Sequence, residues 1–351
     1  MKIVRPILGL ATFLMLTANA PAQVSLTPPA TPTPQPSAKP ADKPKAKAAA
    51  PVATPKPAAM PAPAATVTPA PAPDDPNVDL VYGAYQRGLY KTTFDLATRR
   101  VQQNGDPKAM TMLGELYANA FGVKRDDAKA AEWYKRAADS GDREAMFELA
   151  MFRFAGRGGP VNREEAAKLL ASSAKLGNPK AAYNLALLYL DGQTLPQDLK
   201  RSAELLRIAA DAGSPEAQYA LATFYKEGTG VPKDPEKAAR LLQAAAIADN
   251  VDAEVEYAIA LYNGTGVPKN EAAAMALLRR AARQNNPIAQ NRLAHVLANG
   301  TPADRIEALK WHTIAKSAGK GDPELDVALD RLSPEDRAKA ENEVRKWLGV
   351  K

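Results

Sequence analysis

A 36-residue unit repeats along the chain and constrains its fold more than any other feature. The clearest copy runs from Ser214 to Asp249, and its turn Gly-Thr-Gly-Val-Pro-Lys at 228–233 returns at 264–269. A fixed period of this length is typical of solenoids, in which each unit buries its apolar face against its neighbours. The sequence therefore predicts one elongated array over most of the chain.

Each unit contains the apolar spacing of two helices. The fourth residue is always alanine and the eighth is leucine or tyrosine, which is the i, i+4 spacing of a first helix, here named helix A. The second half carries paired large apolar residues followed by alanine, such as Leu241 and Leu242 before Ala245, and predicts a second helix, helix B. The predicted units are 106–141, 142–177, 178–213, 214–249 and 250–285, with a shortened unit at 286–319.

Glycine and related residues mark both joints of the unit. Helix B is predicted to end at residues that tolerate a left-handed cap, namely Gly141, Gly177, Gly213, Asp249 and Asn285. Between helices A and B stand glycine pairs such as Gly228 and Gly230. The G-K-[ST] sequence of a phosphate loop does not follow these pairs, so they predict structural turns.

These residues resemble the Sel-1-like repeat, a relative of the tetratricopeptide repeat. The first full unit carries the family pattern at Ala109, Leu113, Gly114, Tyr117, Gly122, Trp133 and Gly141. The resemblance covers about 106–319 and implies an all-α, right-handed α/α solenoid of stacked antiparallel helix pairs. It also implies a scaffold or adaptor, since exported bacterial members work in envelope signalling, secretion and cell-wall processes. The chain departs from the pattern at Arg153, at Thr194 and in the shortened segment 300–304.

The regions outside the array differ from it in composition. Residues 1–22 combine early basic residues, an apolar run and small residues, which predicts a signal peptide cleaved after Ala22. The alternative is an uncleaved membrane anchor, although the apolar run is shorter than the ~20 residues of a spanning helix. Residues 76–105 are interpreted as a degenerate N-terminal helix pair, and residues 320–351 as C-terminal capping helices.

Residues 23–75 hold 15 of the 30 prolines of the chain, together with five lysines. Because proline removes backbone donors and disfavours helix in the residue before it, this segment is predicted to be a disordered Pro/Ala-rich linker of extended chain. Three interpretations remain open. The linker acts as a spacer, as a weak cationic tether to anionic envelope polymers, or as a leader with no partner.

Composition excludes several classes of function. The chain has no cysteine, which removes disulfides, thiolate metal sites and thiol nucleophiles, and only His295 and His312 are available as histidine ligands. The formal net charge is +7, of which +4 belongs to the first 75 residues, so the array is close to neutral. Nucleic acid is therefore not an expected partner, and no catalytic residue, cofactor or metal site is predicted.

The predicted partner-binding surface follows from the implied solenoid, in which helix A lines the concave side. The positions left free of packing are the sixth, seventh, tenth and thirteenth, and in the middle units they are apolar and aromatic. The candidate residues are Met151, Phe154, Tyr183, Asn184, Leu187, Leu190, Tyr219, Thr223, Lys226, Ile259 and Tyr262. The tenth and thirteenth positions are preferred, whereas Tyr183 and Tyr219 have packing between helices as an alternative. Leu187→Asp is expected to abolish partner capture and to leave helicity intact.

The predicted function is a non-catalytic periplasmic scaffold or adaptor that binds another protein of the cell envelope through this concave surface. Two alternatives remain open: a regulator of a sensor kinase ectodomain, and a peptidoglycan-associated envelope protein or enzyme subunit. After removal of the signal peptide, no transmembrane segment is expected. His295, at one end of the predicted surface, is interpreted as a solvated or packed side chain, and His312 as a core residue.

Overall fold

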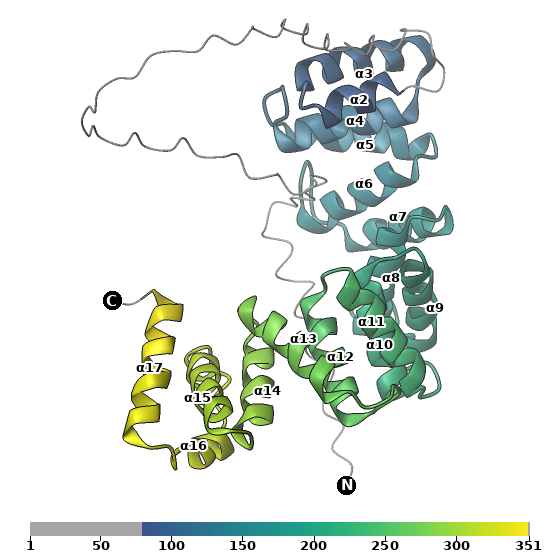
Figure 1. Cartoon of the computed structure of the whole chain (residues 1–351). Helices are drawn as coiled ribbons and strands as arrows, with labels where there is room; N and C mark the ends of the chain where they lie inside the picture. The colour runs from purple at the N-terminus through teal and green to yellow at the C-terminus, as the bar shows by residue number, and fades with distance from the viewer. Residues whose placement is uncertain (1–78, 350–351) are drawn as a thin grey trace, which may run out of the picture.

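The computed structural model describes residues 79–349, and the predicted signal peptide and linker lie outside the described residues. The described part is built from sixteen helices, with no strand between residues 79 and 349 (Figure 1). The chain begins with a short pair, α2 (Leu80–Gln86) and α3 (Tyr90–Asn104), and ends with α16 (Pro323–Leu329) and α17 (Pro334–Leu348).

Six helix pairs lie between these ends. The first helix of each pair is α4 (Pro107–Asn119), α6 (Arg143–Ala155), α8 (Pro179–Asp191), α10 (Pro215–Glu227), α12 (Val251–Asn263) or α14 (Pro287–Ala298). The second is α5 (Asp127–Asp139), α7 (Arg163–Lys175), α9 (Leu199–Asp211), α11 (Pro235–Ile247), α13 (Glu271–Arg283) or α15 (Pro302–Ser317). From α2 to α16 each helix packs on the next along the chain, and α17 packs on α15, which confirms the predicted all-α solenoid.

Capping residues fix where each helix begins. From α4 to α17, every helix follows an Asp, Asn, Ser or Thr whose side chain accepts a hydrogen bond from the backbone of the first turn. The hydroxyl of Ser214, for example, accepts from the Ala217 backbone at 3.2 Å. Each such cap stabilises its helix by ~1 kcal/mol, so the repeated caps set the register of the array.

The predicted left-handed residues end helix B as expected. Gly141, Gly177 and Gly213 have φ values of 89°, 84° and 89°, and Asp249 and Asn285 both have φ of 61°. A positive φ turns the chain sharply back, and a side chain disfavours it except in residues such as Asp and Asn. Helix A of the following unit therefore starts directly after this turn.

Small and large residues alternate in the core between the helices. The alanine at the fourth position of each unit is at most 2% exposed, and large partners such as Leu206 and Leu242 are buried beside them. Small residues allow the helix axes to approach closely, and the large ones fill the remaining space. The core therefore consists of several clusters that follow one another along the array, instead of one centre.

The second glycine of the A–B joint connects neighbouring units. Gly230 has φ of 65°, and a Cβ atom there would collide with the carbonyl oxygen of Leu199, at the start of α9 in the preceding unit. Gly266 lies in the same way on the carbonyl of Pro235, and Gly158 on that of Asp127. These glycines are needed for a close approach between backbones, which explains the turn without a phosphate ligand.

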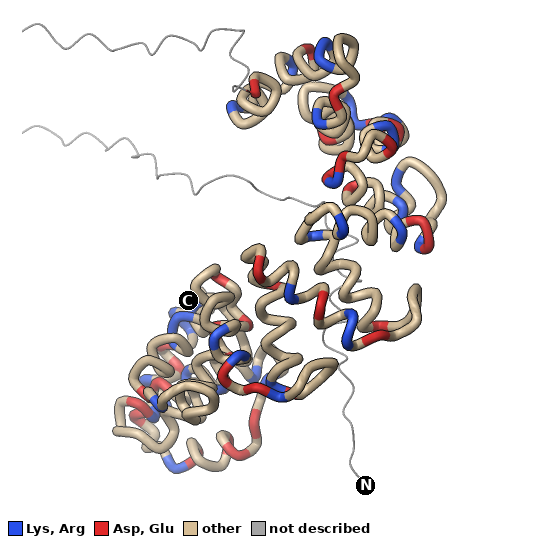
Figure 2. Tube along the Cα trace, turned by 90° about the vertical axis from the view of Figure 1, so that its right-hand side faces the viewer, with Lys and Arg blue, Asp and Glu red and all other residues tan. Residues whose placement is uncertain are grey.

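The stack is curved, and α14 to α17 lie to one side of the direction set by α3 to α9 (Figure 1). Lysine, arginine, aspartate and glutamate are interspersed along the whole array (Figure 2). No helix within residues 79–349 is both long enough and apolar enough to cross a membrane.

Candidate partner-binding face

Helix A of each of the four middle units carries side chains at similar positions that the core does not bury completely. We call this row the A face. Its members come from α6, α8, α10 and α12 and are half-buried or exposed: Glu144, Phe147, Glu148, Met151, Lys180, Tyr183, Asn184, Glu216, Tyr219, Thr223, Lys226, Asp252, Glu256, Ile259 and Tyr262. The row combines aromatic rings, aliphatic groups and carboxylates.

The apolar members of the A face rest on the core. Phe147, Met151 and Tyr183 are partly buried against the largest core cluster, which is centred on α8. Tyr219 packs on the cluster that contains Leu242. Each of these side chains thus has one side held by the protein and another that is accessible, so its conformation is restricted before any partner binds.

Three of the predicted binding residues do not belong to the A face, and two of these three are buried. Leu187 and Leu190 are only 7% and 8% exposed, and both are members of the α8 core cluster. The same cluster contains side chains of α6 and α10. These two helices therefore bury more of the surface of α8 than the repeat pattern indicates. The prediction that these two leucines face an open groove is wrong. Phe154 is half-buried and packs against the same cluster.

The sequence left two interpretations open for Tyr183 and Tyr219: binding to a partner and packing between helices. Their partial burial is compatible with both. Each ring is partly buried, and burial is the main cause that raises the pKa of Tyr183 and of Tyr219 to about 12. The charge of Glu216 adds to the effect at Tyr183, and that of Glu256 at Tyr219. Both hydroxyls therefore remain protonated and lie in a negative potential.

A carboxylate pair marks the N-terminal end of the A face. Burial and, second, the charge of Glu115 raise the pKa of Glu148 to about 7. Glu115 itself is held by hydrogen bonds, because it accepts from the hydroxyl of Tyr134 at 3.1 Å and from Nδ2 of Asn119 at 2.8 Å. Glu148 is thus a half-buried carboxyl whose charge changes near neutral pH.

Sequence reasoning missed the hydrogen bond between Tyr134 and Glu115, although a signal for it was present in the sequence. Every other full unit has alanine at the ninth position and leucine at the position of Tyr134, whereas this unit has Gly114 there. A Cβ on Gly114 would collide with the Tyr134 ring, so the glycine makes room for the larger side chain. The paired exchange of Ala for Gly and Leu for Tyr brings the Tyr134 hydroxyl to Glu115.

An ion pair crosses the C-terminal half of the A face. Nζ of Lys226 on α10 lies 2.8 Å from Oε2 of Glu256 on α12, and both side chains are partly exposed. The ion pair links α10, which carries the predicted residues Thr223 and Lys226, to α12, which carries Ile259 and Tyr262. Such an exposed pair contributes at most ~1 kcal/mol to stability, and its groups are accessible to a partner.

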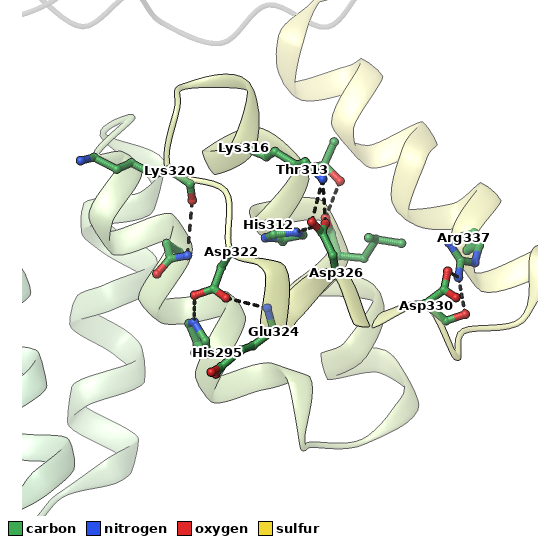
Figure 3. Close-up of polar contacts among 12 residues, drawn as sticks. His295, His312, Thr313, Lys316, Lys320, Asp322, Glu324, Asp326, Asp330 and Arg337 are labelled. Atoms are coloured by element: carbon green, nitrogen blue, oxygen red, sulfur yellow. Dashed lines mark hydrogen bonds and ion pairs between the residues drawn. The ribbon is translucent and has the colours of Figure 1, made fainter. Parts of the chain in front are cut away.

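The C-terminal cap covers the continuation of this row on α14 (Figure 3). Nδ2 of Asn291 donates to the carbonyl of Lys320 at 3.4 Å, and Nε2 of His295 lies 2.7 Å from Oδ2 of Asp322. His295 is thus a packed side chain, in agreement with its interpretation from the sequence. His312 is buried, as its core position predicts, with Nε2 2.7 Å from Oδ1 of Asp326.

We also searched the described residues for side chains that could bind a metal ion. Between residues 79 and 349, no group of three or more His, Asp or Glu side chains is arranged to hold a metal ion. The arrangement of the A face offers side-chain contacts, hydrogen bonds and negative charge.

Comparison with known families identifies the repeat. The Sel1 repeat model matches six consecutive segments, 107–142, 143–178, 179–214, 215–250, 251–286 and 287–320. The chain belongs to the Sel1 repeat family. Proteins of this family generally serve as scaffolds for protein–protein interaction. No curated protein matches the sequence.

Two solved structures share the fold of this Sel1 repeat protein. One is a protective antigen present in uropathogenic Escherichia coli strains, with 24% identity and a TM-score of 0.62, covering 77% of this chain and 63% of that chain. The other is a Sel1 repeat protein from Oxalobacter formigenes, with 26% identity and a TM-score of 0.58, covering 68% of this chain and 98% of that chain. The chain thus spans less than two thirds of the Escherichia coli protein.

Proposed function

We propose that this Sel1 repeat protein is a non-catalytic scaffold of the cell envelope that binds a partner protein through the A face, as the concave side of the solenoid. The observation that carries the proposal is the row of half-exposed aromatic and aliphatic side chains that rest on the core. Tyrosine and methionine are enriched in interfaces, and tyrosine buries a large area at a small loss of conformational freedom.

Charge supports a protein partner with a specific orientation. Glu216 lies near Tyr183, and Glu256 and Asp252 lie near Tyr219, so a partner must match apolar rings and carboxylates together. Complementary charge at an interface directs the approach of the partner and disfavours wrong ones. The proposed surface therefore selects its partner by two properties at once.

The test compares partner capture by variants of the full-length protein in the bacterium that encodes it. The double variant Tyr183→Ala and Tyr219→Ala should reduce the yield of partner, cross-linked in the envelope and identified by mass spectrometry, at least about tenfold, as the loss of two interface anchors implies. The matched control is Ile247→Ala on helix B, where the side chain is 77% exposed and lies off the A face. Equal capture by the tyrosine variant, with retained helicity, would overturn the proposal.

Export to the periplasm is part of the proposal and rests on the composition of residues 1–22. Cell fractionation, followed by sequencing of the mature N-terminus, should find the protein in the envelope fraction and beginning at Gln23. A protein that stays in the cytoplasm would exclude an envelope partner. If the cross-linked partner is a sensor kinase or a peptidoglycan enzyme, its identity distinguishes the two alternatives of the sequence analysis.

A further inference from the structure

We propose that the lysine-rich part of the N-terminal segment, residues 39–56, docks on the A face of the same chain and occupies it until a partner displaces it. This inference rests on the proposed function, because it assigns an occupant to the same surface. It adds a regulatory role for a segment that the repeat pattern leaves unexplained.

Residues 39–56 and the A face differ in the sign of their surplus charge. In α6 to α12 the A face carries four carboxylates, besides Glu148, against two lysines, and one of those lysines, Lys226, already pairs with Glu256. Residues 39–56 carry five lysines and a single aspartate, Asp42. The two regions therefore have opposite surplus charge, whereas the charges of the remaining array are mixed (Figure 2). Opposite potentials of this kind favour association of the two surfaces.

The side chains of residues 39–56 and those of the A face also suit each other in kind. The lysines at 39–56 alternate with alanines and prolines, among them Pro40 and Pro44. Proline-rich chain binds in grooves lined by aromatic residues, since it loses little conformational entropy on binding. Tyr183 and Tyr219 are only partly buried and lie near carboxylates, which suits a chain that presents proline and lysine in turn.

The chain between residues 39–56 and α2 is long enough for these lysines to reach the A face. Lys45 precedes Asp79, the first residue before α2, by 34 residues. At ~3.1 Å per residue an extended proline-rich chain of this length reaches about 105 Å. Eight steps between successively packed helices lead from α2 to α10, and at ~10 Å per step they span about 80 Å at most. The lysines can therefore reach the centre of the A face.

Tethering to the same chain gives residues 39–56 a high effective concentration at the A face. A segment tethered to the same chain meets its site at a concentration that is in the millimolar range for short flexible linkers. Even a docking constant of about 1 mM would then leave the face half occupied. Docking of this strength would weaken the binding of a partner about twofold without preventing it, and salt would relieve it, because screening acts over ~8–10 Å.

The test uses the absence of cysteine, which allows two spin labels to be placed without removing any native thiol. The labels go on Ala48→Cys, beside the lysines, and on Ala155→Cys, an exposed residue at the end of α6. Pulsed dipolar spectroscopy of the full chain at low salt should find a distinct short-distance population. Excess unlabelled protein should leave it unchanged, whereas loss on dilution would assign the face to a second copy and overturn the intramolecular proposal.

Two sets of variants identify the charges involved. Replacement of the five lysines by glutamine, or Glu144→Gln, Glu216→Gln and Asp252→Asn on the A face, should remove most of the short-distance population. The matched control changes exposed acids of helix B, through Glu132→Gln, Glu164→Gln and Glu236→Gln, and should retain it. A distance distribution that is the same in all variants would overturn the docking. The binding function would still stand or fall with the tyrosine variants described above.

Discussion

Nε of Arg153 lies 3.0 Å from Oε2 of Glu165, at the place in the unit where two other repeats pair a tyrosine with a lysine. In the first full unit, Nζ of Lys129 lies 5.4 Å from the centre of the Tyr117 ring. The departure of Arg153 from the family pattern is therefore compensated at the matching residue of helix B. An ion pair replaces a cation–aromatic contact, and the A–B connection is kept.

This compensation predicts non-additive stabilities. Glu165→Lys alone places two cations side by side and should lower the free energy of unfolding by about 1–2 kcal/mol. Adding Arg153→Tyr should restore most of that loss, because it recreates the tyrosine–lysine pair. Urea unfolding of the two single variants and the double variant measures the coupling, and additive losses would contradict the exchange of roles.

The close approach at Gly230 predicts a large cost for a single methyl group. Gly230→Ala should lower the free energy of unfolding by more than about 2 kcal/mol, since it adds a backbone collision to the cost of a positive φ. Gly213→Ala is the matched control, because its φ is also positive but no atom lies within 4 Å of the added Cβ. Thermal unfolding should find the control clearly more stable. Equal losses would mean that the contact with Leu199 is unimportant.

The titration of Glu148 predicts a pH-dependent stability difference. Its pKa is about 7 in the folded protein, above the ordinary value of 4.5, because of burial and the charge of Glu115. The folded state therefore binds this proton more tightly, and its stability falls as the pH rises from about 4.5 to about 7. Nearby Glu144 raises the pKa further, whereas Lys180 and Arg157 lower it.

Glu148→Gln removes this titration and should raise the free energy of unfolding at pH 8 by up to about 3 kcal/mol. At pH 4 the variant and the natural protein should be nearly equal, because both side chains are then neutral. Thermal midpoints across this pH range measure the difference. The control Glu144→Gln, an exposed neighbour, should give a much smaller change, and a gain for Glu148→Gln that is the same at pH 4 and pH 8 would contradict the assignment.

The burial of Leu187 changes what a substitution there can test. Leu187→Asp should lower the free energy of unfolding by more than about 3 kcal/mol, since it replaces a core side chain with a charge. Thr223→Asp, at the same position of the next unit, is half-buried and should cost much less. Circular dichroism during thermal unfolding compares the two. Loss of partner capture by the Leu187 variant would report unfolding, so it does not probe the A face.

The period of the sequence was sufficient to predict the fold, because every element of the unit acts locally. Capping residues such as Ser214 and left-handed residues such as Asp249 determine the ends of helices within a few residues of themselves. The alanine and leucine spacing then defines which side of each helix is buried. These features depend little on the rest of the chain, so the sequence alone was enough to recognise them.

Exposure on the A face was harder to predict, because it depends on neighbours that the period does not describe. Leu187 and Thr223 hold the same position in successive units, yet only Leu187 is buried in the core. The contact between His295 and Asp322 was not predicted either, because Asp322 lies in the cap, outside the repeat. The Tyr134–Glu115 bond needed a comparison of two exchanged positions within one unit.

The glycine contacts between units have a consequence for how such a protein can change in length. Because Gly266 lies on the carbonyl of Pro235 as Gly230 lies on that of Leu199, a second copy of residues 214–249 inserted after residue 249 would meet both neighbours through contacts that already exist. Duplication of whole units thus requires no new type of interface. The number of copies, rather than the sequence of any one, can then determine how long a ligand the molecule spans.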